Sequence, residues 1–167
     1  MRNITFINTL ALCTVMALPA DAQSALPQGC YVRDYSAEHL AKNPNQVVDR
    51  ISVSFRQNAG DRVAQMSVLT ADQGHAGADG HGGQLFAQYL YCFAGNGGAK
   101  NWTCSVECDG GSMEITRVDG KILEFRTNYL LVGEIDECGG AVDLAEVVGQ
   151  RVIYRLNRVA DSQCVIK

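Results

Sequence analysis

Seven cysteines constrain the fold of this 167-residue chain more than any other feature of its sequence. The first, Cys13, lies in an uncharged apolar segment that follows Arg2. A positive start, a short apolar stretch and the A-x-A motif at residues 20–22 are the layout of a secretory signal peptide. We therefore expect residues 1–22 to be removed on export. Residues 23–167 are then expected to form one secreted or periplasmic all-β domain, with no stable membrane span after signal cleavage.

Six cysteines remain in the predicted domain, and an even number in an exported chain indicates disulfide bonds. They are Cys30, Cys92, Cys104, Cys108, Cys138 and Cys164. A metal or redox site built from cysteine normally uses C-x-x-C pairs, and this sequence has none. Disulfide pairing is therefore the better interpretation.

Hairpin geometry favours one of the pairings. Residues 101–108 alternate apolar and polar side chains, which predicts a strand with one buried face. Cys104 and Cys108 would be about 13 Å apart along this strand, too far for a disulfide, which needs Cα atoms within about 7 Å. A preceding strand at 84–94 and a glycine-rich turn predict a hairpin that puts Cys92 opposite Cys104 and Leu90 opposite Val106. We predict a Cys92–Cys104 disulfide.

The four other cysteines can pair in three ways. A Cys30–Cys164 bond would join the two ends of the domain, and Cys108 would then pair with Cys138. We take this arrangement as the expectation, although the sequence leaves the other two open.

Short apolar stretches separated by turn residues predict an antiparallel sandwich or a small barrel of seven to eight strands. One short N-terminal helix is expected at Ala37–Lys42, after the N-cap residue Ser36 and before Pro44. Asp119-Gly120 is a strong hairpin signal. The other predicted strands cover residues 51–56, 63–70, 113–118, 121–127, 130–133 and 151–157, while 141–148 is ambiguous between a helical turn and a loop.

Charge and motifs exclude more functions than they support. The net charge is −4 and no basic run occurs, which argues against a nucleic-acid partner. The sequence contains no G-x-S-x-G or H-E-x-x-H motif, so we predict no catalytic residues. An exported, non-enzymatic domain that binds an unknown protein or small ligand is therefore the first hypothesis. A hydrolase with a site built from scattered residues, among which His39 would be the histidine to consider, is an alternative.

The glycine-rich segment 74–83 supports a second hypothesis, a metal-binding protein. It carries His75, Asp79 and His81, whose side chains are ligand types for Zn²⁺ or Cu²⁺. Three ligands are fewer than the usual four, and a glycine-rich loop loses much entropy when it is ordered. A plain polar loop is the competing interpretation, and no other cofactor is expected.

An aromatic row is the third candidate site. If Cys92 faces the core, then Tyr89, Tyr91 and Phe93 point to the other face of their strand. Across the hairpin, their expected neighbours are Glu107, Ser105 and Thr103, respectively. Exposed aromatic side chains beside polar ones can form a ligand-binding surface. Coverage of this row by a second sheet or by the short helix is the competing expectation, since contiguous exposed apolar patches are uncommon on soluble monomers.

Two arginines near the last predicted strand are a further candidate. Arg151 and Arg155 would share one face of the strand and could bind an acidic group. Such a pair more often belongs to a solvated face.

Overall fold

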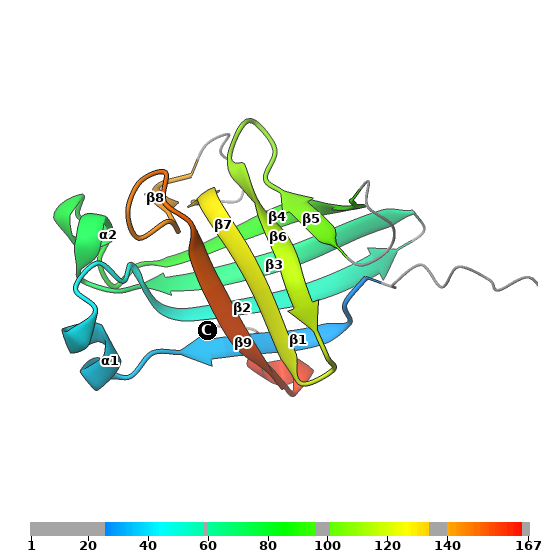
Figure 1. Ribbon diagram of the computed structural model, residues 1–167, viewed down its shortest axis with the longest axis horizontal. Helices are drawn as coiled ribbons and strands as arrows, with labels where there is room; N and C mark the ends of the chain where they lie inside the picture. Colours follow the sequence, from blue (N-terminus) through cyan, green and yellow to red (C-terminus); the bar gives the residue numbers. More distant parts are fainter. Residues whose placement is uncertain (1–25, 59, 96–100, 134–139, 165–167) are drawn as a thin grey trace, which may run out of the picture.

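The computed structural model describes residues 26–58, 60–95, 101–133 and 140–164 (Figure 1). The predicted signal peptide and Cys138 lie outside these residues. Within the described ranges, no helix is both long enough and apolar enough to cross a membrane.

The described residues form a closed antiparallel barrel of eight strands with one extra strand, which confirms the expected small all-β barrel (Figure 1). Each strand from β1 to β7 pairs with the next along the chain, and β9 closes the barrel by pairing with both β7 and β1. The two-residue β8 pairs with β7 outside this ring. The elements are β1 (Gly29–Asp34), α1 (Ala37–Lys42), β2 (Val48–Asn58), β3 (Asp61–Thr70), α2 (Gly74–Ala78), β4 (Leu85–Ala94), β5 (Trp102–Ser105), β6 (Gly111–Val118), β7 (Ile122–Val132), β8 (Val142–Asp143), β9 (Val152–Val159) and the 3₁₀ helix η1 (Asp161–Gln163).

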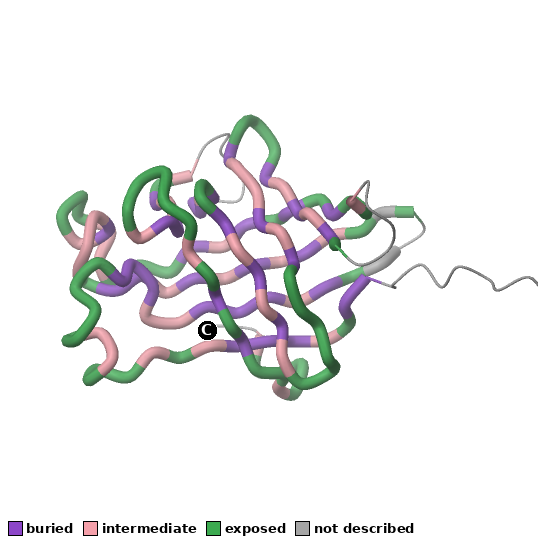
Figure 2. Tube along the Cα trace, viewed as in Figure 1, coloured by how far each residue is buried: buried purple, intermediate pink, exposed green. Residues whose placement is uncertain are grey.

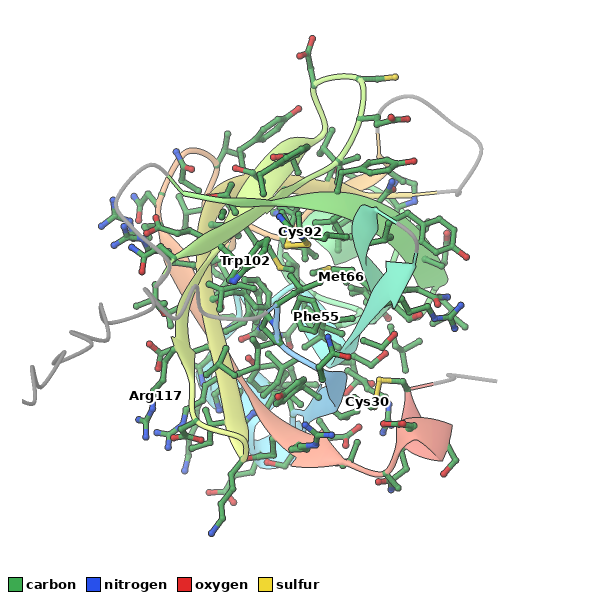
Figure 3. The ribbon with its side chains drawn as sticks, turned by 90° about the vertical axis from the view of Figure 1, so that its right-hand side faces the viewer. Cys30, Phe55, Met66, Cys92, Trp102 and Arg117 are labelled. Atoms are coloured by element: carbon green, nitrogen blue, oxygen red, sulfur yellow. A yellow bond between two sulfur atoms is a disulfide. The ribbon has the colours of Figure 1, made fainter. Side chains whose placement is uncertain are left out.

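The barrel interior is filled by side chains. Alternate residues of each strand point inward, so buried and less buried positions alternate along the strands (Figure 2). A barrel of eight strands is just wide enough for its own side chains to fill. Phe55, Met66, Cys92 and Trp102 lie inside the barrel (Figure 3). Because these interior positions are occupied, a binding site is expected on the outer surface or at the barrel ends.

The Cys92–Cys104 disulfide is part of this core. The two residues lie directly opposite each other on β4 and β5, with 4.0 Å between their Cα atoms. Both are buried in the same apolar cluster as Trp102. This is the pairing that the hairpin register predicted.

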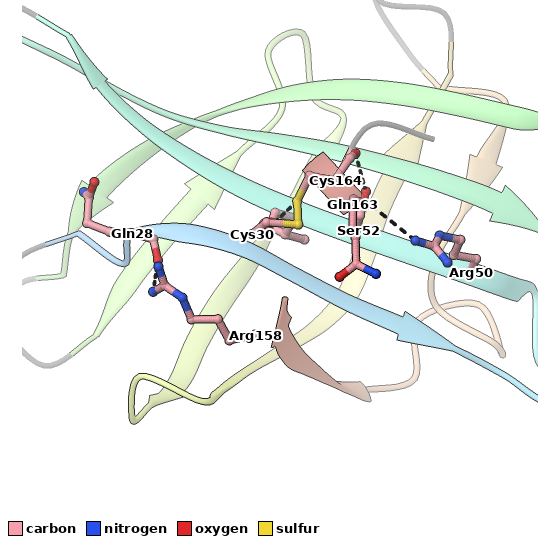
Figure 4. Close-up of a disulfide and its surroundings, with 8 residues drawn as sticks. Gln28, Cys30, Arg50, Ser52, Arg158, Gln163 and Cys164 are labelled. Carbon is pink, nitrogen blue, oxygen red and sulfur yellow. Dashed lines mark hydrogen bonds between the residues drawn. A yellow bond between two sulfur atoms is a disulfide. The ribbon is translucent and has the colours of Figure 1, made fainter. Parts of the chain in front are cut away.

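The Cys30–Cys164 disulfide lies on the outside of the barrel. Cys30 points away from the core, because its neighbour Tyr31 points inward. The bond holds η1 and Cys164 against β1 and β2 (Figure 4). There Ser52 Oγ donates a hydrogen bond to the Cys164 carbonyl at 3.2 Å, and Arg50 Nη2 donates to the Gln163 carbonyl, also at 3.2 Å. This is one of the three arrangements that the sequence left open, and the Cys108–Cys138 pair stays a prediction.

The strand predicted at 101–108 is too long. β5 ends at Ser105, and Cys108 and Asp109 adopt left-handed backbone angles, with φ of 55° and 64°. Such angles break a strand ladder, so Cys108 lies exposed in a tight turn and Leu90 does not pair with Val106. The backbone amide of Val106 instead donates to the Gly111 carbonyl at 3.0 Å.

Two other strands differ from the expectation. β1 was not predicted, because Cys30, Tyr31 and Val32 are all buried and therefore show no polar alternation. β7 runs through residue 132 without a break, so the stretch 130–133 is not a separate strand. The Asp119-Gly120 turn is confirmed: Asp119 Oδ1 accepts from the Ile122 amide at 2.9 Å, and Gly120 has a φ of 80°.

Candidate functional site

The histidines of segment 74–83 do not form a metal site. Residues 74–78 form the short helix α2 rather than an open loop. His75 Nε2 lies 3.1 Å from the Ala145 carbonyl, whereas His81 packs edge-on against the Phe86 ring with centroids 5.9 Å apart. Because the two imidazoles contact different parts of the protein and Asp79 is exposed, the three side chains do not converge. Among the described residues, no group of three His, Cys, Asp or Glu side chains could hold a metal ion.

The imidazoles also show no hydrolase geometry. His39 packs at a tilt against Tyr35, with 4.8 Å between ring centroids. In the described part of the chain, no imidazole nitrogen is hydrogen-bonded to a Ser hydroxyl or to a carboxylate. A Ser-His-Asp site requires both of these bonds.

An aromatic face, formed by Tyr89, Tyr91 and Phe93, lies on the outer side of β4. The three side chains are exposed by 39%, 40% and 61%, respectively, whereas Cys92 between them points inward. The expectation that a second sheet or the short helix covers them is therefore wrong. The barrel forms a single closed sheet, and α1 lies at the end of the barrel where β4 begins, whereas Phe93 is next to the last residue of β4 (Figure 1).

Polar residues flank the aromatic face on both neighbouring strands. Tyr91 lies between Val63 of β3 and Ser105 of β5, while Phe93 lies opposite Thr103 and Tyr89 opposite Gln65. The sequence predicted Ser105 and Thr103 in these positions. It also predicted Glu107 opposite Tyr89, which is wrong because Glu107 belongs to the turn after β5.

A groove of about 600 Å³ lies beside the aromatic face. Its floor consists of small outward-facing residues on three adjacent strands, Ser54, Ser67 and Ala87. Gln65 lines the groove and is also the cross-strand neighbour of Tyr89, so the groove and the aromatic face form one continuous surface. Asp161 and Cys164 form the opposite wall of the groove.

Sequence reasoning missed this groove. Each of its floor residues is an ordinary small residue in an alternating strand, which by itself signals nothing. Only the register of β2, β3 and β4 brings Ser54, Ser67 and Ala87 together.

The combined surface offers aromatic rings, hydroxyl groups and amides to a ligand. The side chains of Ser54, Gln65 and Ser67 make no hydrogen bonds to other described residues, so their polar groups are available. Arg56, at the edge of the groove, adds an exposed guanidinium. The chain matches no protein-family model, no curated protein and no solved structure.

Proposed function

We propose that this chain is an exported, disulfide-stabilised binding protein whose ligand is another protein, bound on the aromatic face and in the adjacent groove. The observation that carries the proposal is the exposure of Tyr89, Tyr91 and Phe93 in one row beside that groove. A disulfide-bonded β-barrel fits a protein of an oxidising, non-cytoplasmic compartment.

The chemistry of the aromatic face favours a macromolecular partner. Single exposed apolar residues are common, but three on one strand, about 6.8 Å apart from one to the next, form a contiguous patch. Tyrosine and arginine are enriched among the residues that dominate protein–protein binding energies, and both occur here. Water is released from these rings when a partner covers them, which stabilises the complex.

The shape of the surface also favours a macromolecular partner. The aromatic rings stand on the outside of a barrel, where a small molecule could be contacted from one side only. The groove beside them has a floor of small side chains, and a side chain from a partner could insert there. Polar groups of Gln65, Thr103 and Ser105 surround the rings, as in the polar rim of an interface.

Site-specific photocrosslinking in the cell that exports the protein tests this proposal. A benzoylphenylalanine replaces Tyr91 in one variant and Val148 in the control. Val148 is 78% exposed in the loop before β9, so random collisions would label it at least as often as position 91. We expect one discrete protein adduct from position 91, no such adduct from position 148, and loss of the adduct when Phe93→Ala is added.

Three outcomes would contradict the proposal. The first is the absence of an adduct at position 91. The second is the same set of adducts at both positions, which would indicate non-specific contact. The third is an adduct that contains only two copies of this chain, which would assign the aromatic face to self-association.

A further inference from the structure

A second hollow opens on another side of the barrel, where β1 and β9 separate. β1 pairs with β2 over all six of its residues but with β9 only from Cys30 to Val32. Beyond that point β9 runs away from β1 towards β8 (Figure 1). The ladder between the two strands is therefore incomplete, and a crevice of about 530 Å³ lies in the gap.

Two guanidinium groups line this crevice from opposite sides. Arg33 belongs to the end of β1 that does not pair with β9, and Arg155 belongs to β9. Neither arginine forms an ion pair with a carboxylate of the described residues, in contrast to Arg50 and Arg126, which pair with Asp34 and Glu114. Glu124, the cross-strand neighbour of Arg155, accepts a hydrogen bond from Thr116 instead.

The floor of the crevice holds a buried amide whose nitrogen is not fully hydrogen-bonded. Gln46 lines the crevice and is only 3% exposed, and its Nε2 has no hydrogen-bond partner among the described residues. The Gln46 side chain lowers the pKa of the nearby Tyr154 phenol, whose hydroxyl can accept one amide N–H while it donates to the Leu144 carbonyl at 2.7 Å. The amide nitrogen carries a second N–H, and a buried donor without a partner is unfavourable, so Gln46 indicates a place for a polar ligand atom that accepts a hydrogen bond.

Aromatic rings form one wall. Tyr35 packs at a tilt against His39, and the Arg33 guanidinium lies 4.9 Å from the centroid of the Tyr35 ring. Burial raises the pKa of the Tyr35 phenol, partly offset by Arg33, so the hydroxyl stays protonated and can donate. Among the described residues of the lining, the one carboxylate is that of Glu146, on the loop before β9.

We propose that this crevice binds a small organic acid with a ring, whose carboxylate is held by Arg33 and Arg155. The lining favours a monoanion, because it carries two positively charged guanidinium groups and one negatively charged carboxylate, that of Glu146. Glu146 accepts a hydrogen bond from a hydroxyl or ammonium group on the same ligand, and the Tyr35–His39 wall packs against its ring. This site is separate from the aromatic face on β4, so each proposal can be contradicted without affecting the other.

A matched series of probes tests each part of this assignment. The compounds 3-phenylpropionate, 3-phenyllactate and L-phenylalanine all have a ring and a carboxylate. The first has no further polar group, the second has a hydroxyl, and the third has an ammonium group. Phenethylamine lacks the carboxylate, and inorganic phosphate lacks the ring. Each is titrated into the ¹⁵N-labelled, oxidised exported protein, and chemical shifts of the crevice residues are followed by NMR.

We expect saturable shifts with the three carboxylates, tighter binding of the hydroxyl and ammonium compounds, and none with phenethylamine. Arg155→Gln weakens binding of the three carboxylates by about tenfold or more, because it removes one charge-assisted contact. Arg151→Gln, an exposed arginine of the same region outside the crevice, leaves binding unchanged. Glu146→Gln removes the advantage of L-phenylalanine over 3-phenylpropionate.

Four results would overturn the assignment. Absence of saturable shifts with every carboxylate at about 10 mM would show that the crevice is no such site, since a weak ligand has a dissociation constant near 1 mM. Equal effects of Arg155→Gln and Arg151→Gln would show non-specific charge attraction. Phosphate binding as tight as that of the carboxylates would show a general anion site. Phenethylamine binding as tight as 3-phenylpropionate would show that the carboxylate plays no part.

Discussion

Cys92 and Cys104 lie directly opposite each other on β4 and β5, and their disulfide is buried inside the barrel beside Trp102. On the other side of β4 the neighbouring residues Tyr91 and Phe93 are exposed. One strand therefore carries a covalent core link on its inner face and the proposed binding surface on its outer face.

Removing the buried disulfide should destabilise the domain. The double variant Cys92→Ala/Cys104→Ala is expected to lower the free energy of unfolding by about 3 kcal/mol, because the bond closes a short loop in the unfolded chain. Urea unfolding followed by circular dichroism measures this difference. An unchanged midpoint and slope would show that the bond does not stabilise the native state.

The outer disulfide closes a loop with a sequence separation of 134 and so also stabilises the whole fold, but its largest effect on local opening should be on the residues that it holds. In the double variant Cys30→Ala/Cys164→Ala, we expect faster hydrogen exchange in residues 161–164, which the bond holds against β1 and β2. The amides of Phe125 and Tyr154, in the paired centre of β7 and β9, should stay protected under native conditions. Equal acceleration at all of these positions would contradict a local role of the bond.

Truncation of two phenylalanines to alanine should change the free energy of unfolding by very different amounts. Phe125 is fully buried and stacks on Tyr154, whereas Phe93 is 61% exposed. Phe125→Ala should lower the free energy of unfolding by about 3–5 kcal/mol, and Phe93→Ala by less than about 0.5 kcal/mol. A large loss for Phe93→Ala would show that this ring belongs to a packed core rather than to a binding surface.

Alkaline pH should destabilise the domain through Tyr154. Burial raises the pKa of its phenol well above the ordinary value of 10.0. Above pH 10 the unfolded chain therefore releases this proton while the folded protein retains it. The free energy of unfolding then falls as pH rises, by up to about 1.4 kcal/mol per pH unit for this tyrosine.

The variant Tyr154→Phe serves as the test of this pH dependence. It should reduce the alkaline loss of stability, and the remaining slope should include Tyr35, whose pKa is also raised by burial. At neutral pH the variant should be less stable by about 1 kcal/mol, because the hydrogen bond to the Leu144 carbonyl is lost. Identical slopes above pH 10 in both proteins would contradict the assignment to Tyr154.

Local patterns explain what could be predicted from the sequence. The register of Cys92 with Cys104 follows from one hairpin. Alternation along β4 places the side chains of Tyr89 and Cys92 on opposite faces of the strand. The end of β5 was missed because the alternation continues through Cys108, although the backbone there turns left-handed.

The features that could not be predicted from the sequence depend on packing between segments far apart in the chain. Whether the aromatic face would be covered depends on where the other elements pack, and alternation in β4 alone cannot show this. The crevice exists because β1 and β9, more than a hundred residues apart in the chain, pair for only three residues. Arg155 was considered as an anion-binding residue from the sequence, but its neighbour in the crevice is Arg33 rather than Arg151.

The affinity of the partner crosslinked at position 91 tests the proposed function most directly. Calorimetry with that purified partner compares the unmodified chain with Tyr91→Ala and with the exposed control Val148→Ala. Tyr91→Ala should raise the Kd by about tenfold to a hundredfold without changing the free energy of unfolding, whereas Val148→Ala should leave the Kd unchanged. A Kd for Tyr91→Ala within about twofold of that of the unmodified chain would contradict binding through the aromatic face.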